Sequence, residues 1–341
     1  MTCAFPICAQ LEDLGWSSFF ADQILPNETD LVPARVTEVH RTRLAVVSVP
    51  GYRALGPRDG EPTALYAVGD WVLIDNDQAQ IIRRFDRKSL LQRRIEGRDE
   101  PQLAAANVDS LFIVTSCNAD FNVARLERYL SMANEAGTTP VIVLTKVDTV
   151  EDSGPFEEQA RALQRDLAVV AVNAKSAQTI AILSPWLGRN QTVALAGSSG
   201  VGKSTLVNLV SVHDDDRPQR TGGIRKNNAK GRHTTTARSL HATVGGGWII
   251  DSPGMRNLHV SDVTGGIETT FSEIVGLASS CKFRDCSHTH EPGCAVRTAV
   301  ASGKLTEARL ARWRKLHEEN SKSTPRQSGP RGNKIATRAF K

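Results

Sequence analysis

The sequence predicts an α/β domain built on a mostly parallel sheet, with a small β-barrel before it and a Cys/His-rich segment after it. From about residue 107, apolar runs of strand length alternate with helical patterns, which is typical of a sheet covered by helices on both faces. Residues 34–86 instead carry short strand-like runs separated by Gly- and Pro-containing breaks. After residue 265, cysteines and histidines cluster. A chain of 341 residues is long enough for two or three domains.

The first domain is expected to be an OB-fold barrel over residues 34–92. Its strand-like runs are ARVTEVHRTRLAVVSV, ALYAVGDWVLID and AQIIRRF, and short strands at this spacing fit a small barrel of OB-fold size. The arginines in this region either serve RNA or form ordinary polar strand faces: Arg35, Arg41, Arg43, Arg53, Arg83 and Arg84. Residues 1–33 are assigned to an N-terminal extension.

The central domain is expected to span residues 93–265. Its helix over 121–136 places Val123, Leu126, Leu130 and Ala133 at helical spacing, and a second helix is expected over 156–167. The apolar runs of strand length are VDSLFIVTS, TPVIVLT, LAVVAV, TVALAG, LHATV and GWIID. In such a sheet, ligands bind at the C-terminal ends of the strands.

The stretch GSSGVGKST directly follows the strand TVALA and precedes an apolar helical run, which is the context expected for a phosphate-binding loop. In this loop, backbone N–H groups surround phosphate oxygens, Lys203 reaches the outer phosphates and the Ser204 hydroxyl binds Mg²⁺. The alternative is a Gly-rich loop without a ligand, but Lys-Ser at this position has no comparable structural use. The predicted loop residues are Gly197, Ser198, Ser199, Gly200, Val201, Gly202, Lys203, Ser204 and Thr205.

Two further stretches are placed to complete a magnesium and γ-phosphate site. In DSPG, Asp251 ends an apolar strand, so it can hold the Mg²⁺ shell while the Gly254 N–H approaches the γ-phosphate. In GRHTTT, a threonine hydroxyl, assigned to Thr235, completes the shell only when the γ-phosphate is present. The alternative for GRHTTT is a plain surface loop.

The base-reading residues are expected in LTKVD and VNAKS. Asp148 accepts from the N1 and N2 donors of guanine, which adenine lacks, and Lys146 lies along the ring. Thr145 stands where Asn is commoner, and its hydroxyl is free to tie this loop to the phosphate loop. The predicted residues are Thr145, Lys146, Val147 and Asp148 in the first loop, and Asn173, Ala174 and Lys175 in the second.

These loops occur in an unusual order, because the guanine loops precede the phosphate loop. A doubly wound sheet tolerates this order, since the loops meet at one edge however the strands are joined. The sequence therefore predicts a circular permutation.

The segment Cys281-x4-Cys286-x-His288-x5-Cys294 offers three thiolates and an imidazole, a closed tetrahedral set for a structural Zn²⁺. His290 is a competing ligand, and chance clustering of buried thiols is the alternative. Cys3, Cys8 and Cys117 are scattered, which argues against a disulfide framework.

The end of the chain is basic. From Lys304 to Lys341 there are eleven Lys or Arg and three acids, and residues 321–341 are expected to be a disordered tail after a helix at 305–320. Such a tail is either simply solvated or bound to phosphate groups of nucleic acid. The chain has no apolar run that could span a bilayer and no basic region before the apolar residues at its start, so a cytoplasmic protein is expected.

Taken together, LTKVD, GSSGVGKST, GRHTTT, DSPGMR and CKFRDCSHTHEPGCAV resemble the circularly permuted GTPases of the RsgA (YjeQ) family, which act in maturation of the small ribosomal subunit. The resemblance runs from about residue 34 to 320. It implies an OB-fold, a permuted GTPase domain, a zinc domain and weak hydrolysis of GTP to GDP that the subunit stimulates. The expected partners are GTP or GDP and the small ribosomal subunit with its rRNA, for a protein expected to be monomeric.

The resemblance also bears on the hydrolytic step. Met255 stands where many GTPases place a Gln that orients the attacking water. By family resemblance this role passes to His233, for which a solvent-exposed loop histidine is the alternative reading.

Two other function classes are disfavoured. A P-loop ATPase would usually carry Glu after Asp251, where this chain has Ser252. In an ATPase the stretch LTKVD would also have no function. An RNA-binding module with a vestigial nucleotide site would not need to retain Lys203, Ser204, Asp251 and Asp148 together.

Overall fold

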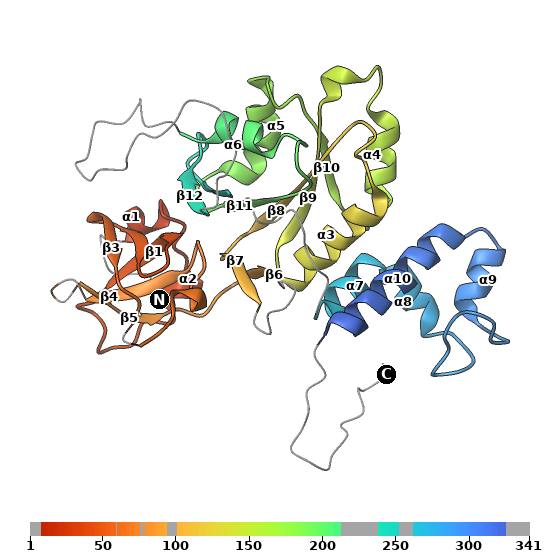
Figure 1. The fold of residues 1–341 in the computed structure, drawn as a ribbon, viewed down its shortest axis with the longest axis horizontal. Helices are drawn as coiled ribbons and strands as arrows, with labels where there is room; N and C mark the ends of the chain where they lie inside the picture. Colours follow the sequence, from red (N-terminus) through yellow and green to blue (C-terminus); the bar gives the residue numbers. More distant parts are fainter. Residues whose placement is uncertain are drawn as a thin grey trace, which may run out of the picture.

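The computed structural model describes residues 8–58, 60–75, 77, 79–93, 101–212, 238–251 and 262–324 (Figure 1). Its central sheet has the strand order β10-β9-β8-β11-β13-β12. The first five strands in this order run parallel and β12 is antiparallel to β13. Their bounds are β8 Ser110–Ser116, β9 Thr139–Thr145, β10 Ala168–Ala171, β11 Thr192–Ala196, β12 Ser239–Ala242 and β13 Trp248–Asp251.

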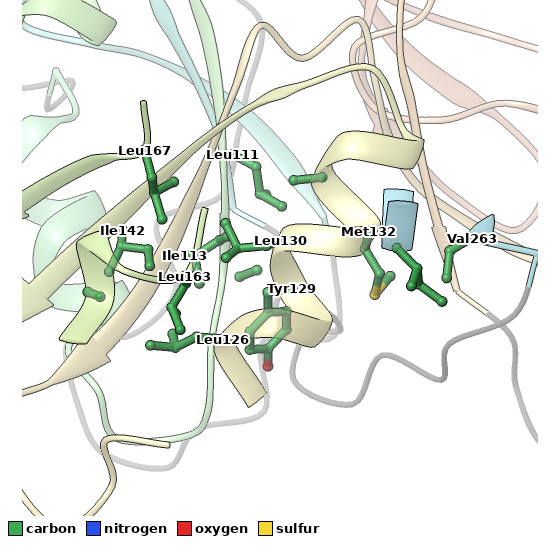
Figure 2. Close-up of a cluster of buried hydrophobic side chains, with 14 of the residues drawn as sticks. Leu111, Ile113, Leu126, Tyr129, Leu130, Met132, Ile142, Leu163, Leu167 and Val263 are labelled. Atoms are coloured by element: carbon green, nitrogen blue, oxygen red, sulfur yellow. The ribbon is translucent and has the colours of Figure 1, made fainter. Parts of the chain in front are cut away.

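Four helices cover the two faces of this sheet: α3 Val123–Glu135, α4 Gly154–Arg161, α5 Gln178–Leu187 and α6 Lys203–Val210. Alternate residues of β8 point to opposite faces. Leu111 and Ile113 pack with Leu126 and Leu130 of α3 (Figure 2), whereas Phe112 packs with residues of α5 and α6. The prediction of an α/β fold with helices on both faces is confirmed.

The circular permutation is confirmed by the chain order. β8, β9 and β10 with their helices come before β11 and the phosphate loop, yet β11 pairs directly with β8. The C-terminal ends of β9, β10, β11 and β13 therefore meet along one edge of the sheet, because these strands are parallel.

The N-terminal barrel consists of β1 Val32–Val39, β2 Leu44–Ser48, β3 Gly51–Leu55, β4 Trp71–Asp75 and β5 Gln80–Arg84, with a short 3₁₀ helix at Thr63–Leu65. All its pairings are antiparallel, in the order β3-β2-β1-β4-β5, and β1 pairs with both β2 and β4. This is the small five-stranded arrangement expected of an OB-fold.

The N-terminal extension packs on the outside of this barrel. Leu11 of α1 Cys8–Glu12, Phe20 of α2 Ser18–Ala21 and Trp16 between the two helices form a cluster with Trp71 and Phe85. The Trp16 and Trp71 rings meet edge to face at 4.8 Å. Residues from Leu11 onward are thus part of the barrel's packing.

Two features connect the barrel to the central sheet. β6 Leu90–Arg93 and β7 Gln102–Ala106 form a two-stranded sheet in the connection, and β1 pairs with β12 at Glu38 and Ser239. Near this junction Arg35 is fully buried. Arg35 is therefore accessible neither to solvent nor to RNA. Both interpretations from the sequence, an RNA contact and an ordinary polar strand face, are wrong for this residue.

The C-terminal helices are α7 Thr264–Thr270, α8 Ser272–Ala278, α9 Ala295–Ala301 and α10 Glu307–Ser323, and they lie on the α3 side of the molecule, away from the barrel (Figure 1). The backbones of α7 and α3 touch, because a Cβ on Gly266 would lie 1.8 Å from the Ser131 carbonyl oxygen. Helix α10 extends through Ser323, three residues into the predicted tail, which corrects that boundary. Residues 325–341 lie outside the described part of the chain. Among the described helices, none combines the length and apolarity that crossing a membrane requires.

Candidate nucleotide site and metal site

The phosphate loop connects β11 to α6, and its glycines are required by close backbone contacts. Gly197 has φ +143°, and a Cβ there would lie 2.2 Å from the Val114 carbonyl oxygen of β8. Gly200 and Gly202 also have positive φ values, of +79° and +102°. Only glycine adopts this sequence of conformations without strain, which leaves the backbone N–H groups free to converge on an anion.

The ammonium group of Lys203 lies across the mouth of this loop. Its Nζ donates to the Gly197 carbonyl at 2.7 Å and to the Ser198 carbonyl. Lys203 is the first residue of α6, and Ser204, the predicted magnesium ligand, follows it with an exposed side chain. Both side chains thus lie at the edge of the sheet where β11 ends.

Thr145 joins the first base-reading loop to the phosphate loop. Its hydroxyl, at the end of β9, lies 2.5 Å from the Val201 carbonyl oxygen and 3.1 Å from the Thr115 carbonyl oxygen. The predicted tie between the two loops is therefore present. Thr145 is completely buried, so the contact is shielded from water.

The base-reading loops are shaped by local backbone contacts. Lys146 has φ +58°, which turns the chain into the 3₁₀ segment Val147–Thr149 and leaves Asp148 exposed. In the second loop, Asn173 Oδ1 accepts from the Lys175 N–H at 3.0 Å, and the Asn173 carbonyl accepts from Thr179 Oγ1 at 2.6 Å. An Asn forms such a turn through its side chain as a Ser does.

The two loops also lie next to each other, because the Val172 N–H donates to the Leu144 carbonyl at 2.8 Å. Ala174 is buried and Lys175 is exposed. Asp251, the last residue of β13, ends a strand next to β11. His233, Thr235 and Gly254 lie outside the described residues.

Two residues that contact the phosphate loop were missed by the sequence analysis. Asp120 and Arg125, from the segment between β8 and the first turn of α3, both form hydrogen bonds with the Ser198 hydroxyl. No motif marks them, since charged residues after a strand are ordinary solvent-facing positions in most sequences.

The Cys/His segment brings its four predicted ligands together. The ligand atoms of Cys281, Cys286, His288 and Cys294 all lie within 4.8 Å of one another. Cys281 Sγ and Cys294 Sγ are 3.9 Å apart, and each lies 3.5 Å from His288 Nδ1. A tetrahedral ion with Zn–S bonds of about 2.3 Å would separate its sulfur ligands by roughly 3.8 Å. The donor set and its spacing therefore fit a metal ion.

The surrounding structure orients these ligands. Cys294 precedes α9 and its sulfur accepts from the Arg297 N–H at 3.4 Å, while the His288 ring lies 5.6 Å from the Trp313 ring of α10. Burial holds the pKa of His288 below its usual value, which favours the neutral imidazole that binds metal. The alternative ligand His290 is exposed and contacts Thr289 at 3.1 Å instead.

Cys117 behaves as an ordinary buried thiol. Burial raises its pKa to about 11, so it remains protonated at neutral pH. Its backbone N–H donates to the Thr145 carbonyl at 3.0 Å, so the residue contributes to the scaffold of the nucleotide site.

Comparison with known proteins identifies the family. The model of the RsgA GTPase family matches residues 84–261. A protein of Mesorhizobium japonicum named small ribosomal subunit biogenesis GTPase RsgA is 60% identical over 324 residues, which cover 95% of this chain and 94% of that protein. A Vibrio vulnificus protein named small ribosomal subunit biogenesis GTPase RsgA 2 is 45% identical over 313 residues, covering 91% of this chain and 88% of that protein.

Two solved structures share the fold. YjeQ from Thermotoga maritima has a TM-score of 0.60 at 23% identity, over 85% of this chain and 98% of that one. YloQ, described as a circularly permuted GTPase, has a TM-score of 0.60 at 24% identity, over 89% of this chain and 99% of that one. These structures agree with the permuted order of β8 to β13, and the family model together with the two relatives shows that the chain belongs to the RsgA GTPase family.

Proposed function

We propose that this protein hydrolyses GTP to GDP and phosphate and acts in biogenesis of the small ribosomal subunit, which stimulates the hydrolysis. The relatives' names support the ribosomal role, and family membership supports GTP as the substrate. The observation that carries the nucleotide assignment is the contact between Thr145 Oγ1 and the Val201 carbonyl. It joins a base-reading loop to a phosphate loop, so that one nucleotide spans both.

Within this site, Asp148 reads guanine, because it is an exposed carboxylate at the end of β9 and guanine presents two adjacent donors. Asn173, Ala174 and Lys175 form the second wall of the base pocket. Ser204 and Asp251 would hold Mg²⁺, with Thr235 joining them in the GTP state. Lys203 exchanges the Gly197 and Ser198 carbonyls for phosphate oxygens when the nucleotide binds.

The metal of the Cys/His segment is proposed to be a structural Zn²⁺ held by Cys281, Cys286, His288 and Cys294. Three thiolates and one imidazole are a zinc-preferring set, and four protein ligands leave no position for a reacting water. The proposed organisation is an extension at 1–33, an OB-fold domain at 34–92, a GTPase domain at 93–265 and a zinc domain from 266 to the end of α10 at Ser323. The protein acts as a cytoplasmic monomer, and the barrel and the zinc domain contact rRNA.

Guanine selectivity can be tested with Asp148→Asn. The substitution replaces one of the two acceptor oxygens with an NH₂ donor that opposes a guanine donor, so GTP affinity should fall by about tenfold or more and preference should shift towards xanthosine triphosphate. The measurement is hydrolysis of GTP, ATP and xanthosine triphosphate with and without purified small subunits. Glu151→Gln is the matched control, since this neighbouring acid is also exposed. Unchanged GTP affinity in Asp148→Asn would exclude the assignment.

His233 is proposed to orient the attacking water, since Met255 cannot. Phosphoryl transfer depends on such positioning. His233→Ala should retain GTP and subunit binding but lose most of the subunit-stimulated rate. Stimulated turnover within about twofold of the unmodified protein, less than roughly 0.4 kcal/mol of barrier, would remove His233 from the mechanism.

A further inference from the structure

A closed polar cluster of Asp120, Arg125 and Ser198 joins the start of α3 to the phosphate loop. Arg125 Nη1 donates to Ser198 Oγ and, at 3.1 Å, to Asp120 Oδ1. Ser198 Oγ in turn donates to Asp120 Oδ2 at 2.8 Å. Arg125 Nη2 also donates to the Asp120 carbonyl at 3.1 Å. The Ser198 hydroxyl thus accepts from a cation and donates to an anion, which is the stronger class of hydrogen bond.

The segment that presents this cluster is itself held in place. Asn118 Oδ1 accepts from the Asp120 N–H and from Ser116 Oγ, both at 2.9 Å. Asn122 caps α3, because its side chain accepts from the Arg125 N–H at 2.9 Å. Asp120 and Arg125 are therefore fixed relative to β8 and α3 and do not simply follow the phosphate loop.

Ser198 is the residue whose position controls the mouth of the loop. Its carbonyl and that of Gly197 both accept from Lys203 Nζ. Gly197 is already in contact with the Val114 carbonyl, so this end of the loop cannot shift towards β8. The Thr145 hydroxyl holds the Val201 carbonyl further along the loop. The phosphate loop is thus anchored from β8 and α3 at one point and from β9 at the other.

We propose that Asp120 and Arg125 are positioning residues that preorganise the phosphate loop for GTP and GDP through Ser198. They act on the loop and not on the nucleotide, and the inference rests on the proposed nucleotide site. A loop that is already ordered loses less conformational freedom when the ligand binds, so the cluster raises affinity without adding a contact to the ligand.

The test is a titration of the full-length protein with a fluorescent GDP analogue. Arg125→Ala should weaken binding by about three- to tenfold, less than a buried charge-assisted hydrogen bond contributes, because the side chains of Arg125 and Asp120 are 32% and 34% exposed. Arg128→Ala is the matched control, because Arg128 lies one turn further along α3 and pairs with Glu319. The affinity of this variant for GDP should stay within about twofold of that of the unmodified protein.

A double-mutant cycle distinguishes positioning from general weakening of α3. Ser198→Ala and Arg125→Ala break the same cluster, so the double variant should lose little more affinity than the weaker-binding single variant. In steady-state hydrolysis without subunits, KM for GTP should rise while kcat stays within about twofold, since the loop holds the ground state and transition state alike. Additive losses in the cycle, or a kcat loss without a KM change, would overturn the proposal.

The outcomes also separate this inference from the proposed function. If the unmodified protein bound neither GDP nor GTP, the proposed function would be wrong. If it bound both and Arg125→Ala bound them equally well, only the positioning role would be wrong. Should Arg125→Ala fail to fold, Asp120→Asn carries the same test, because it removes the charge that holds Arg125 and Ser198 while keeping the shape of the side chain.

Discussion

Two buried arginines lie where the flanking domains meet the central sheet, and they are compensated in different ways. Arg309 of α10 belongs to the junction with the C-terminal helices, and Arg35 of β1 belongs to the junction with the barrel. The side chain of Arg309 is 9% exposed and Arg35 as a residue is 0% exposed. Burying a guanidinium costs desolvation free energy at both junctions. The hydrogen-bond and ion-pair partners of each arginine therefore decide how far the stability of its junction depends on it.

Arg309 has charged partners. It donates to Glu127 Oε1 at 2.7 Å and to Glu273 Oε1 at 2.8 Å, and its Nη2 donates to the Leu163 and Thr270 carbonyls, both at 2.8 Å. The guanidinium also lies 4.0 Å from the Phe271 ring centroid. One side chain thereby connects α10 to α3, α7 and α8.

Arg35 has neutral acceptors. It donates to the Leu14 carbonyl at 2.6 Å and to Thr192 Oγ1 at 2.7 Å, while its Nε has no hydrogen-bond partner among the described residues. Burial lowers the pKa of Arg35 to about 10, and the nearby Asp109 offsets part of this effect. The barrel junction therefore carries an incompletely compensated cation, whereas pairing of β1 with β12 and burial of Val68 in the same apolar cluster as Ile250 supply its other contacts.

The difference indicates that the C-terminal junction depends on ion pairs and the barrel junction on packing. Removing one partner of a buried ion pair leaves the other charge unpaired, which costs more than removing a poorly compensated charge. Three experiments test this difference between the two junctions.

Metal removal should have the largest effect, confined to the segment around the ligands. Structural zinc supplies about 10–16 kcal/mol of local folding free energy in small zinc domains. Chelation or Cys286→Ser should therefore unfold residues 281–301, seen as lost amide protection, while α7 and α10 stay docked on α3 through Arg309 and Gly266. GDP binding should be retained. Protein purified without any bound metal, yet with this segment protected, would contradict the prediction.

Arg309→Ala should have the next largest effect, a loss of overall stability. It leaves Glu127 buried with Arg312 as its remaining described ion-pair partner and opens space beside Phe271, so unfolding free energy should fall by about 2–3 kcal/mol, less than a wholly unpaired buried charge costs. The measurement is a urea denaturation midpoint. Arg297→Ala is the matched control, because it breaks an exposed pair with Glu307 and should barely change the midpoint. Equal midpoints for the two variants would mean that ion pairs do not hold this junction.

Arg35→Met should have the smallest effect, a change of about 1 kcal/mol or less in unfolding free energy. The methionine loses two hydrogen bonds but removes a desolvated cation and keeps an apolar side chain of similar length against Trp71 and Trp248. A loss as large as that of Arg309→Ala would show that Asp109 compensates Arg35 fully. Asp109→Asn would then have to be equally destabilising, which a second denaturation series checks.

The local motifs were determined by the sequence alone. Gly197 to Thr205 form one turn and the start of one helix. The backbone conformation of a phosphate-binding loop restricts which residue types can occupy these positions, so the loop could be predicted from local sequence. Cys281, Cys286, His288 and Cys294 lie within fourteen residues, and their spacing already predicted the cluster that the structure contains. The inner strands β8, β9 and β11 were equally predictable, because each is a mostly apolar run that is buried along nearly its whole length.

The tertiary structure alone decided the roles of the charged residues. Arg35 reaches Thr192 across 157 residues, Arg309 reaches Glu127 across 182, and Asp120 reaches Ser198 across 78. In the sequence each of them looks like part of a solvated face, since the cost of burying a charge makes exposure the usual outcome. Only a folded chain brings the compensating partner next to such a charge. For this reason the sequence predicted the candidate nucleotide and metal ligands, while the fold determined which charged side chains hold the domains and the phosphate loop in place.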